Sequence, residues 1–564
     1  MTRRRKMGKF NLIDEAWISV MTNEKGHTKE VSLTEIFENT NQYIDLAGDS
    51  PTQDFAILRI LLAVLHTVFS RFNAKGQAYS YFEVNDQLRQ TTALEEDDED
   101  DYIDELYETW DELWKTKEFP DIINHYLSKW HEHFYLFDEE FPFFQVTEKV
   151  IAPENISRPK PSSISGKTIN RLISESGNKA ALFSPKTDSN KEVLTAAEIA
   201  RWLLTYQGYC GLSDKVIFGK EKYKASKGWL FDIGGVFFKG SNLFDTLLLN
   251  LILVHPNNDS FNTIQKPSWE FSGEEVVARS FSGIEADNLA ELYTNWGRAV
   301  YIHSAIDITK PFSFDVVKLP DIDHQNHFLE PMTIWRYNKQ GENKDTHTPR
   351  KHQIEQSMWQ SFGLIALPND YELEQKRPGI MDWLDSISDS IVDYDLRIEA
   401  VSMKDDGNAT SWMPIDEIYD SLRINDLVLT DDADNGWIIR IYEAVDRTKE
   451  VINRVYRGFL VDIRKIRQLS PNHQIVSRGV EELFYIIDQP FREWISSIKP
   501  SVSKKDKIAE WYNTLDKIVN DQAEKMLKNA VYRDYKGIKS DKQEDSTENI
   551  ITAYNRFKYF LNKR

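Results

Sequence analysis

The chain has 564 residues, 69 of them basic and 90 acidic, so its formal net charge is −21. Hydrophobic residues make up 41% of it and aromatic residues 12%, which excludes an intrinsically disordered protein and, at this length, predicts two or more domains. The single cysteine, Cys210, excludes a disulfide framework and a cysteine-cluster zinc site.

The N-terminal segment MTRRRKMGKF is basic, but no apolar stretch follows it, so we expect no secretory signal. The longest apolar runs, such as residues 60–65, are too short to cross a bilayer. We therefore expect a cytoplasmic protein with no membrane partner. Its acidity disfavours non-specific binding to nucleic acid, so any such contact has to use local basic patches.

The clearest helix start is at Ser50 and Pro51, because serine is a favoured N-cap and proline a favoured first helical residue. Apolar residues follow at helical spacing and predict a core helix: Phe55, Leu58, Leu62, Leu65 and Phe69. A shorter helix is expected to start near Ser32 and Leu33.

Three histidines invite a metal interpretation: His125, His131 and His133. The last two are two residues apart, which does not place them on one face of a helix, and no carboxylate cluster completes the set. We expect neither a metal site nor a cofactor.

Residues 158–179 form a basic stretch in an acidic chain. Only Glu175 opposes its basic residues, which are Arg158, Lys160, Lys167, Arg171 and Lys179. Gly166 and Gly177 would let the backbone approach a ligand closely, and small polar residues beside them supply hydrogen-bond donors. This composition is typical of a loop that contacts phosphates or enters a nucleic-acid groove, although a solvated surface loop has the same composition.

Residues 165–168 (SGKT) resemble the end of a P-loop, which raises the alternative of a nucleotide hydrolase. The motif needs glycine where this chain has Pro161, and an apolar strand where it has RPKP. Both mismatches disfavour that alternative.

A second basic patch is predicted at residues 215–239, where six lysines accompany only two acids, Glu221 and Asp232. Residues expected to bind phosphates across the two stretches are Lys160, Lys167, Arg171, Lys220, Lys222, Lys224 and Lys227. Further on, residues 312–318 and 332–337 alternate in the manner of strands and could pair as a hairpin. Residues 398–403 predict another strand, followed by a tight turn at residues 404–411.

From about Ile415 the pattern changes to apolar residues every three or four positions, over residues 438–466, 480–494, 508–526 and 551–560. Pro471, Pro500 and a polar run separate these segments, and Pro490 should kink the second. The chain is thus predicted to be an α+β protein, with a large mixed α/β body over residues 1–414 and an up-and-down four-helix bundle over residues 415–564.

Several segments, in order, carry a family resemblance: FNLIDEAWISV, LAGDSPTQDFAILRILLAVLH, FPFFQV, INRLISESGNKAALF, GVFFKGSNLFDTLLLNLILV and LYTNWGRAVYI. With the terminal bundle, they resemble the large-subunit (CasA) family of the type I-E CRISPR surveillance complex, Cascade. The resemblance runs over essentially the whole chain.

The resemblance implies a non-catalytic subunit that recognises the protospacer-adjacent motif of double-stranded DNA from the minor groove. It implies a role in opening the duplex for pairing with the CRISPR RNA, and in recruiting a helicase-nuclease. The implied partners are the backbone, 5′-handle-binding and small subunits of Cascade, the CRISPR RNA, the target DNA and the helicase-nuclease.

The resemblance also assigns three DNA-reading elements. The glycine loop of the family falls on Ser174, Ser176, Gly177, Asn178 and Lys179, with Ser174 in place of the first glycine. The hairpin lysine falls on Lys318, with Lys310 as the alternative. The strand-separating wedge falls on Gly407, Asn408, Ala409 and Thr410, where better-known members have a glutamine. The zinc-binding CxxC of some members has no counterpart here.

One further alternative stays open. In it the chain is a scaffold whose bundle binds partners while its loops read no motif.

Overall fold

The computed structural model describes residues 8–169, 186–187, 189–256, 263–369, 375–539 and 547–563. The chain divides into two compact units. Unit 1 contains Met1–Ile354, Leu373–Ser390 and Arg397–Ser421, and unit 2 contains Glu355–Glu372, Ile391–Leu396 and Leu422–Arg564. The α+β class and the helical C-terminal region are as predicted.

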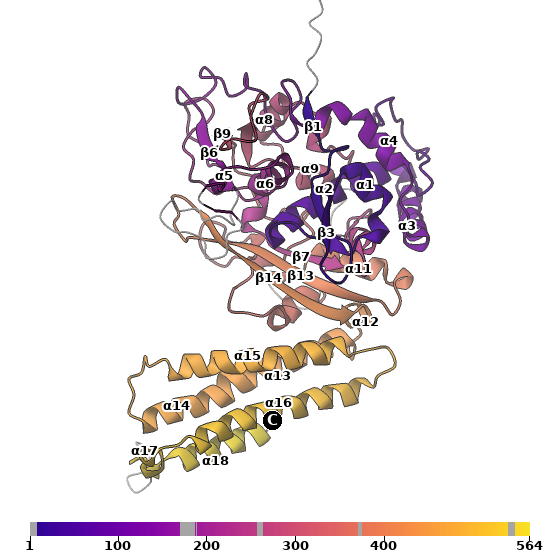
Figure 1. Ribbon diagram of the computed structural model, residues 1–564. Helices are drawn as coiled ribbons and strands as arrows, with labels where there is room; N and C mark the ends of the chain where they lie inside the picture. Colours follow the sequence, from indigo (N-terminus) through magenta and orange to yellow (C-terminus); the bar gives the residue numbers. More distant parts are fainter. Residues whose placement is uncertain are drawn as a thin grey trace, which may run out of the picture. The chain divides into compact units, whose positions relative to one another are not determined.

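Unit 1 is built around α2 (Pro51–Phe69), which packs against α6 (Ala196–Gly208) and α9 (Leu289–Tyr293) (Figure 1). The side chain of Ser50 accepts a hydrogen bond from the backbone N–H of Gln53, so the predicted N-cap and first-turn proline are confirmed. By length and composition α2 could cross a membrane, but 94% of its most apolar window is buried inside the protein. It is a core helix.

The other helices of unit 1 range from one turn to 18 residues in length. They are α1 (Leu33–Glu38), α3 (Glu99–Thr116), α4 (Ile122–Lys129), α5 (Gly166–Ile169), α6 (Ala196–Gly208), α7 (Leu243–Leu249), α8 (Gly273–Phe281), α9 (Leu289–Tyr293) and α11 (Gly379–Ser386). The helix predicted near Ser32 is α1, with Ser32 as its N-cap.

The described sheets that involve unit 1 have two or three strands each. One sheet pairs β1 (Lys9–Asn11) with β5 (Tyr135–Phe137), and another has the order β3 (Thr28–Val31), β2 (Ile18–Met21), β4 (Asp45–Leu46). A third has the order β11 (His347–Pro349), β10 (Trp335–Tyr337), β12 (Gln375–Lys376). A fourth has the order β14 (Pro414–Asn425), β13 (Asp395–Asp405), β7 (Gly234–Lys239).

The sheet that bears on function has the order β6 (Ser162–Ser165), β9 (Ser313–Lys318), β8 (Arg298–Tyr301), with antiparallel pairing throughout. The predicted pairing of residues 312–318 with 332–337 is therefore wrong. Strand β9 lies between β6 and β8, and β10 pairs with β11 and β12 instead. Alternating residues predict a strand but do not select its partner.

Unit 2 contains a helical bundle in which four long segments lie side by side over its described residues (Figure 1). The first is α13 (Trp437–Glu450), a π-helical turn η10 (Val451–Tyr456) and α14 (Arg457–Ile466) in succession. The others are α15 (Ile475–Ser496), α16 (Lys504–Lys528) and α18 (Ile550–Asn562). The helix α15 continues through Pro490.

Aromatic side chains fill the bundle core. Phe491 and Trp511 have ring centroids 4.8 Å apart, and the indole N–H of Trp511 donates to Thr448 Oγ1 at 2.9 Å. Shorter elements complete unit 2: α10 (Phe362–Ala366), α12 (Leu427–Thr430), α17 (Tyr532–Lys536), β15 (Ile538–Lys539) and β16 (Thr547–Glu548).

The division between the units differs from the predicted boundary at residues 414 and 415. Strand β14 begins at Pro414 and its first part belongs to unit 1 up to Ser421. Unit 2 also takes in residues 355–372 and 391–396, which the predicted boundary assigned to the body. A periodicity rule finds the long helices but does not find these short segments.

Candidate nucleic-acid interface

The wedge residues lie in the turn between β13 and β14, residues 406–413, called the wedge turn below. Gly407, Asn408, Ala409 and Thr410 are all exposed, and Gly407 has a positive φ of 67°, which glycine adopts without strain. The carboxylate of Asp406 accepts the amide N–H groups of Asn408 and Met413 and the hydroxyl of Ser411. These hydrogen bonds lower the pKa of Asp406, and the bond from the amide N–H of Asn408 contributes most. The carboxylate therefore stays ionised at the centre of the turn.

Asn408 uses only half of its amide group within this turn. Its Oδ1 accepts from the backbone N–H and the hydroxyl of Thr410, at 3.1 and 2.8 Å. Its Nδ2 donates to no described residue, so an exposed pair of donors remains on the turn.

Lys318 ends strand β9 and is half-buried. Its ammonium group donates to the carbonyl oxygen of Leu212 at 3.2 Å, and burial lowers its pKa. The alternative, Lys310, lies in the connection between β8 and β9, where 75% of its side chain is exposed and Asp307 is 3.4 Å away. Of the two, Lys310 is the lysine that projects from the hairpin.

Leu212 joins Lys318 to the wedge turn. Its carbonyl accepts from Lys318, and its backbone N–H donates to the carbonyl of Ser411 at 2.7 Å. The neighbouring Gly211 has a φ of 67°, and a Cβ there would lie 2.6 Å from the carbonyl oxygen of Trp412. Only glycine permits this close approach of the two segments.

The second basic segment does not form a uniform patch. Lys220 and Lys222 are exposed. Lys224 is paired with Asp321 at 2.8 Å and Lys227 with Asp232 at 2.5 Å. The ammonium group of Lys227 also lies 4.9 Å from the ring centroid of Trp412, so this lysine makes a cation–π contact with the wedge turn.

The first basic stretch is only partly described. Lys160 is exposed, and Lys167 lies 4.0 Å from Glu192. Arg171 and the glycine-loop residues Ser174, Ser176, Gly177, Asn178 and Lys179 lie outside the described residues.

The geometry around Gly166 does not match a P-loop. The strand that precedes it, β6, is mostly polar and is not the apolar strand that the motif needs, and the amide N–H of Gly166 donates to the carbonyl of Phe312 at 2.8 Å. A P-loop needs such amides free to surround phosphates. Among the described residues, no three His, Cys, Asp or Glu side chains are grouped to hold a metal ion.

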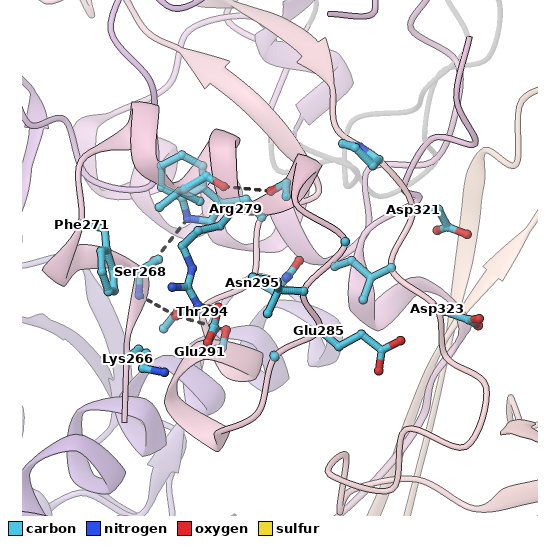
Figure 2. Close-up of a pocket in the computed structure, with 18 residues that line it drawn as sticks. Lys266, Ser268, Phe271, Arg279, Glu285, Glu291, Thr294, Asn295, Asp321 and Asp323 are labelled. Atoms are coloured by element: carbon cyan, nitrogen blue, oxygen red, sulfur yellow. Dashed lines mark hydrogen bonds and ion pairs between the residues drawn. The ribbon is translucent and has the colours of Figure 1, made fainter. Parts of the chain in front are cut away.

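A hollow of about 260 Å³ lies between α8, α9 and the segment that follows β9 (Figure 2). Its lining includes Glu285, Glu291, Asp321 and Asp323 against two basic residues, Lys266 and Arg279, and Arg279 is paired with Glu291. An excess of carboxylates repels phosphate, so this hollow is unsuited to a nucleotide.

Two residues of this region, Gly211 and Leu212, were not singled out from the sequence. Leu212 acts through its backbone N–H and C=O groups. Almost every residue type carries both groups, so no sequence motif could have identified this position.

Comparison with known proteins places the chain among CRISPR-associated proteins. A sequence model of the family "CRISPR-associated protein Cse1" matches residues 11–522. The CasA/Cse1 protein of Thermus thermophilus is 31% identical over 268 residues, an alignment that spans 46% of this chain and 42% of that relative.

Solved structures show the same fold. Cse1 of Thermobifida fusca matches with a TM-score of 0.73 at 21% identity, over 98% of this chain and 97% of that one. Cse1 of Acidimicrobium ferrooxidans matches with a TM-score of 0.71 at 20% identity, over 99% of both chains. A chain of a "CRISPR RNA-guided surveillance complex" matches with a TM-score of 0.65 at 15% identity, over 99% and 100%.

Proposed function

This chain belongs to the CRISPR-associated Cse1 family, and from that membership we propose that it is the non-catalytic, DNA-reading large subunit of a cytoplasmic CRISPR RNA-guided surveillance complex. In this role it recognises the protospacer-adjacent motif of a duplex from the minor groove. It then helps to open the duplex, so that base pairing with the guide RNA reads the remaining sequence.

The observation that carries the proposal is the wedge turn and its attachment. An exposed turn of four small residues is held at its base by Asp406 and by the hydrogen bond between Leu212 and Ser411. A turn that is small at its tip and anchored at its base suits insertion into a narrow groove.

The chemistry of the turn suits the minor groove. Its floor displays acceptors, N3 of purines and O2 of pyrimidines, and one donor at G·C pairs. The unused Nδ2 donors of Asn408 complement those acceptors. Because this pattern is nearly degenerate, we expect the protein to accept several related motifs.

Three exposed lysines supply positive charge on this otherwise acidic molecule. These three, together with the exposed Lys222, would contact phosphates without reading sequence: Lys160, Lys220 and Lys310. Lys318 and Lys227, which are partly buried and bonded within the protein, would position the wedge turn. The glycine loop with Gly177 and Lys179 remains a proposed second reader.

The proposed partners are those that the family resemblance implies, and a similar chain belongs to a "CRISPR RNA-guided surveillance complex". We expect the backbone, 5′-handle-binding and small subunits, the CRISPR RNA, the target duplex and a helicase-nuclease that degrades the target. Cutting is assigned to that last partner, so purified chain alone should turn over no nucleotide.

The test is binding of the reconstituted complex to duplexes that share one target sequence and differ only in the flanking bases. We expect a small set of flanks to bind at least tenfold more tightly than the rest, since one base contact contributes roughly 1–3 kcal/mol. Equal affinity for all flanks, with complex assembly intact, would leave the chain as a scaffold.

A further inference from the structure

Arg298 is fully buried in unit 1, at the first position of β8 and in register with Lys318 of β9. Its Nε donates to Asp214 Oδ2 at 3.0 Å and one Nη2–H donates to Asp214 Oδ1 at 2.8 Å. Asp214 is itself 7% exposed. The two side chains therefore form a two-pronged ion pair out of contact with water.

The other guanidinium N–H groups bind backbone carbonyls. They donate to Gly211 at 2.5 Å, to Ser226 at 2.6 Å and to Gly297 at 2.7 Å. All five donors of the guanidinium group are thus used, and their planar arrangement fixes the direction of each bond. A lysine at this position has three donors on one atom and cannot reproduce the set.

The backbone that Arg298 holds is the segment to which the DNA-reading elements are attached. Gly211 and Asp214 flank Leu212, whose N–H binds Ser411 of the wedge turn and whose C=O binds Lys318. Ser226 precedes Lys227, whose ammonium group faces the ring of Trp412. One side chain therefore holds the segments that carry Leu212 and Lys227, both of which contact the wedge turn.

We propose that Arg298 and Asp214 form a positioning pair that fixes the wedge turn relative to Lys318, and that motif discrimination depends on this spacing. The second half of this inference rests on the proposed function, whereas the first half concerns the free protein. The pair is buried and contacts no DNA itself, and it positions the wedge turn through Leu212.

Unit 1 contains a matched control. Arg71 is equally buried, is paired with Glu270 at 2.9 Å, and also donates to two backbone carbonyls, those of Leu88 and Gln265. Among the described residues, no hydrogen bond links the segments that Arg71 holds to Leu212 or to the wedge turn. Arg71→Lys should therefore destabilise unit 1 much as Arg298→Lys does, without moving the wedge turn.

The first experiment measures hydrogen exchange of the two variants as isolated chains. We expect Arg298→Lys to speed exchange at least tenfold in peptides covering residues 208–214 and 405–413, and Arg71→Lys to leave those peptides unchanged. Equal exchange there in both variants would overturn the positioning role. If Arg298→Lys does not yield folded protein, Asp214→Asn, which is isosteric, gives the same readout.

The second experiment measures, in the assembled complex, the ratio of Kd for a motif-mutated duplex to Kd for a motif-bearing one. We expect this ratio to fall roughly tenfold in Arg298→Lys and to stay unchanged in Arg71→Lys, since the loss of a base contact has that size. Replacement of residues 407–410 by Gly-Ser-Gly-Ser is measured beside them. If that replacement lowers the ratio and Arg298→Lys does not, the inference fails and the proposed function stands. If neither lowers it, the proposed role of the wedge turn in motif reading fails, and equal affinity of the wild-type complex for both duplexes would overturn the proposed function itself.

Discussion

Asn408 carries two separable roles in the wedge turn. Its Oδ1 holds Thr410, which shapes the turn, while its Nδ2 group binds no described residue and, in the proposed function, donates to the groove floor. Substitutions that keep one role and remove the other can therefore distinguish shape from base contact.

Asn408→Asp keeps the acceptor that Thr410 needs and removes the donors. We expect the discrimination ratio of the assembled complex to fall about tenfold, because the minor-groove acceptors lose their partner. Asn41→Asp, an exposed site elsewhere in unit 1, makes the same change in charge and is the control. If both variants lose discrimination equally, the effect is one of charge alone.

Two lysines in one segment differ in surroundings and should differ in effect. Lys220 is exposed, whereas Lys227 is paired with Asp232 and lies under Trp412. In titrations of the complex against salt, Lys220→Met should reduce the slope of log Kd by about 1, as expected for one lost phosphate contact. Lys227→Met should change the slope less and discrimination more. A larger change in slope for Lys227→Met than for Lys220→Met would indicate that Lys227 binds a phosphate.

At the scale of elements, the close approach of the 211–212 segment to the β13–β14 turn can be tested directly. Gly211→Ala places a Cβ 2.6 Å from the carbonyl oxygen of Trp412, at a φ of 67°. We expect faster hydrogen exchange in residues 405–413 and a lower discrimination ratio.

Gly219→Ala is the control for that substitution. Gly219 has a similar φ of 61°, but a Cβ there meets no atom within 4 Å. It carries the same backbone strain, on the order of 1 kcal/mol, without the contact. Should the two variants behave alike, strain and not the contact would explain the loss.

Local signals predicted the helices well, because a helix is specified by residues near one another in sequence. The serine cap and first-turn proline located the start of α2, and apolar spacing located the long helices of unit 2. Strand pairing failed because β9 pairs with β6, about 150 residues earlier, and no local signal records that contact.

The candidate site was predictable to the same extent. The turn at residues 407–410 follows from its composition, but its anchor does not. Lys318 looked like a projecting lysine, yet it is half-buried and bonded to Leu212, since its strand position places it beside the buried Arg298. Lys224 looked free because its acidic partner, Asp321, lies far away in sequence and is brought close only by the fold. Lys227 is paired with Asp232, one of the two acids of its own segment, and the sequence did not show which lysine that acid would bind.

At the scale of the molecule, two buried histidines make unit 1 sensitive to acid. Burial lowers the pKa of His66 to about 3. It also lowers the pKa of His255 to about 4, although the hydrogen bond to the carbonyl of Leu329 opposes this shift. Below a pH of about 6.5 the unfolded chain binds protons that the folded chain excludes, so the free energy of unfolding falls with falling pH. Asp54 has the opposite effect on the free energy of unfolding. Burial raises its pKa to about 7, so below that pH the folded chain binds a proton that the unfolded chain does not.

Comparison of variants isolates the histidine contribution. We expect the loss of unfolding free energy between pH 7 and pH 5 to be about 2 kcal/mol smaller in His66→Leu, measured by urea denaturation with a probe in unit 1. The exposed residue His125, changed to leucine, is the control and should leave the loss as it is in the wild type. No difference between the two variants would mean that His66 is not held neutral.

The molecule as a whole is acidic, yet its proposed ligand is a polyanion. This is consistent if sequence is read by a few small groups and most of the binding free energy comes from the RNA and the other subunits. The proposed motif recognition therefore depends on the wedge turn.

The most direct test compares the wild-type complex with one in which residues 407–410 are replaced by Gly-Ser-Gly-Ser, and measures Kd for motif-bearing and motif-mutated duplexes in both. We predict that the replacement brings the two Kd values within about twofold of each other, while the complex assembles and binds pre-opened target normally. Discrimination that survives the replacement undiminished would contradict the account.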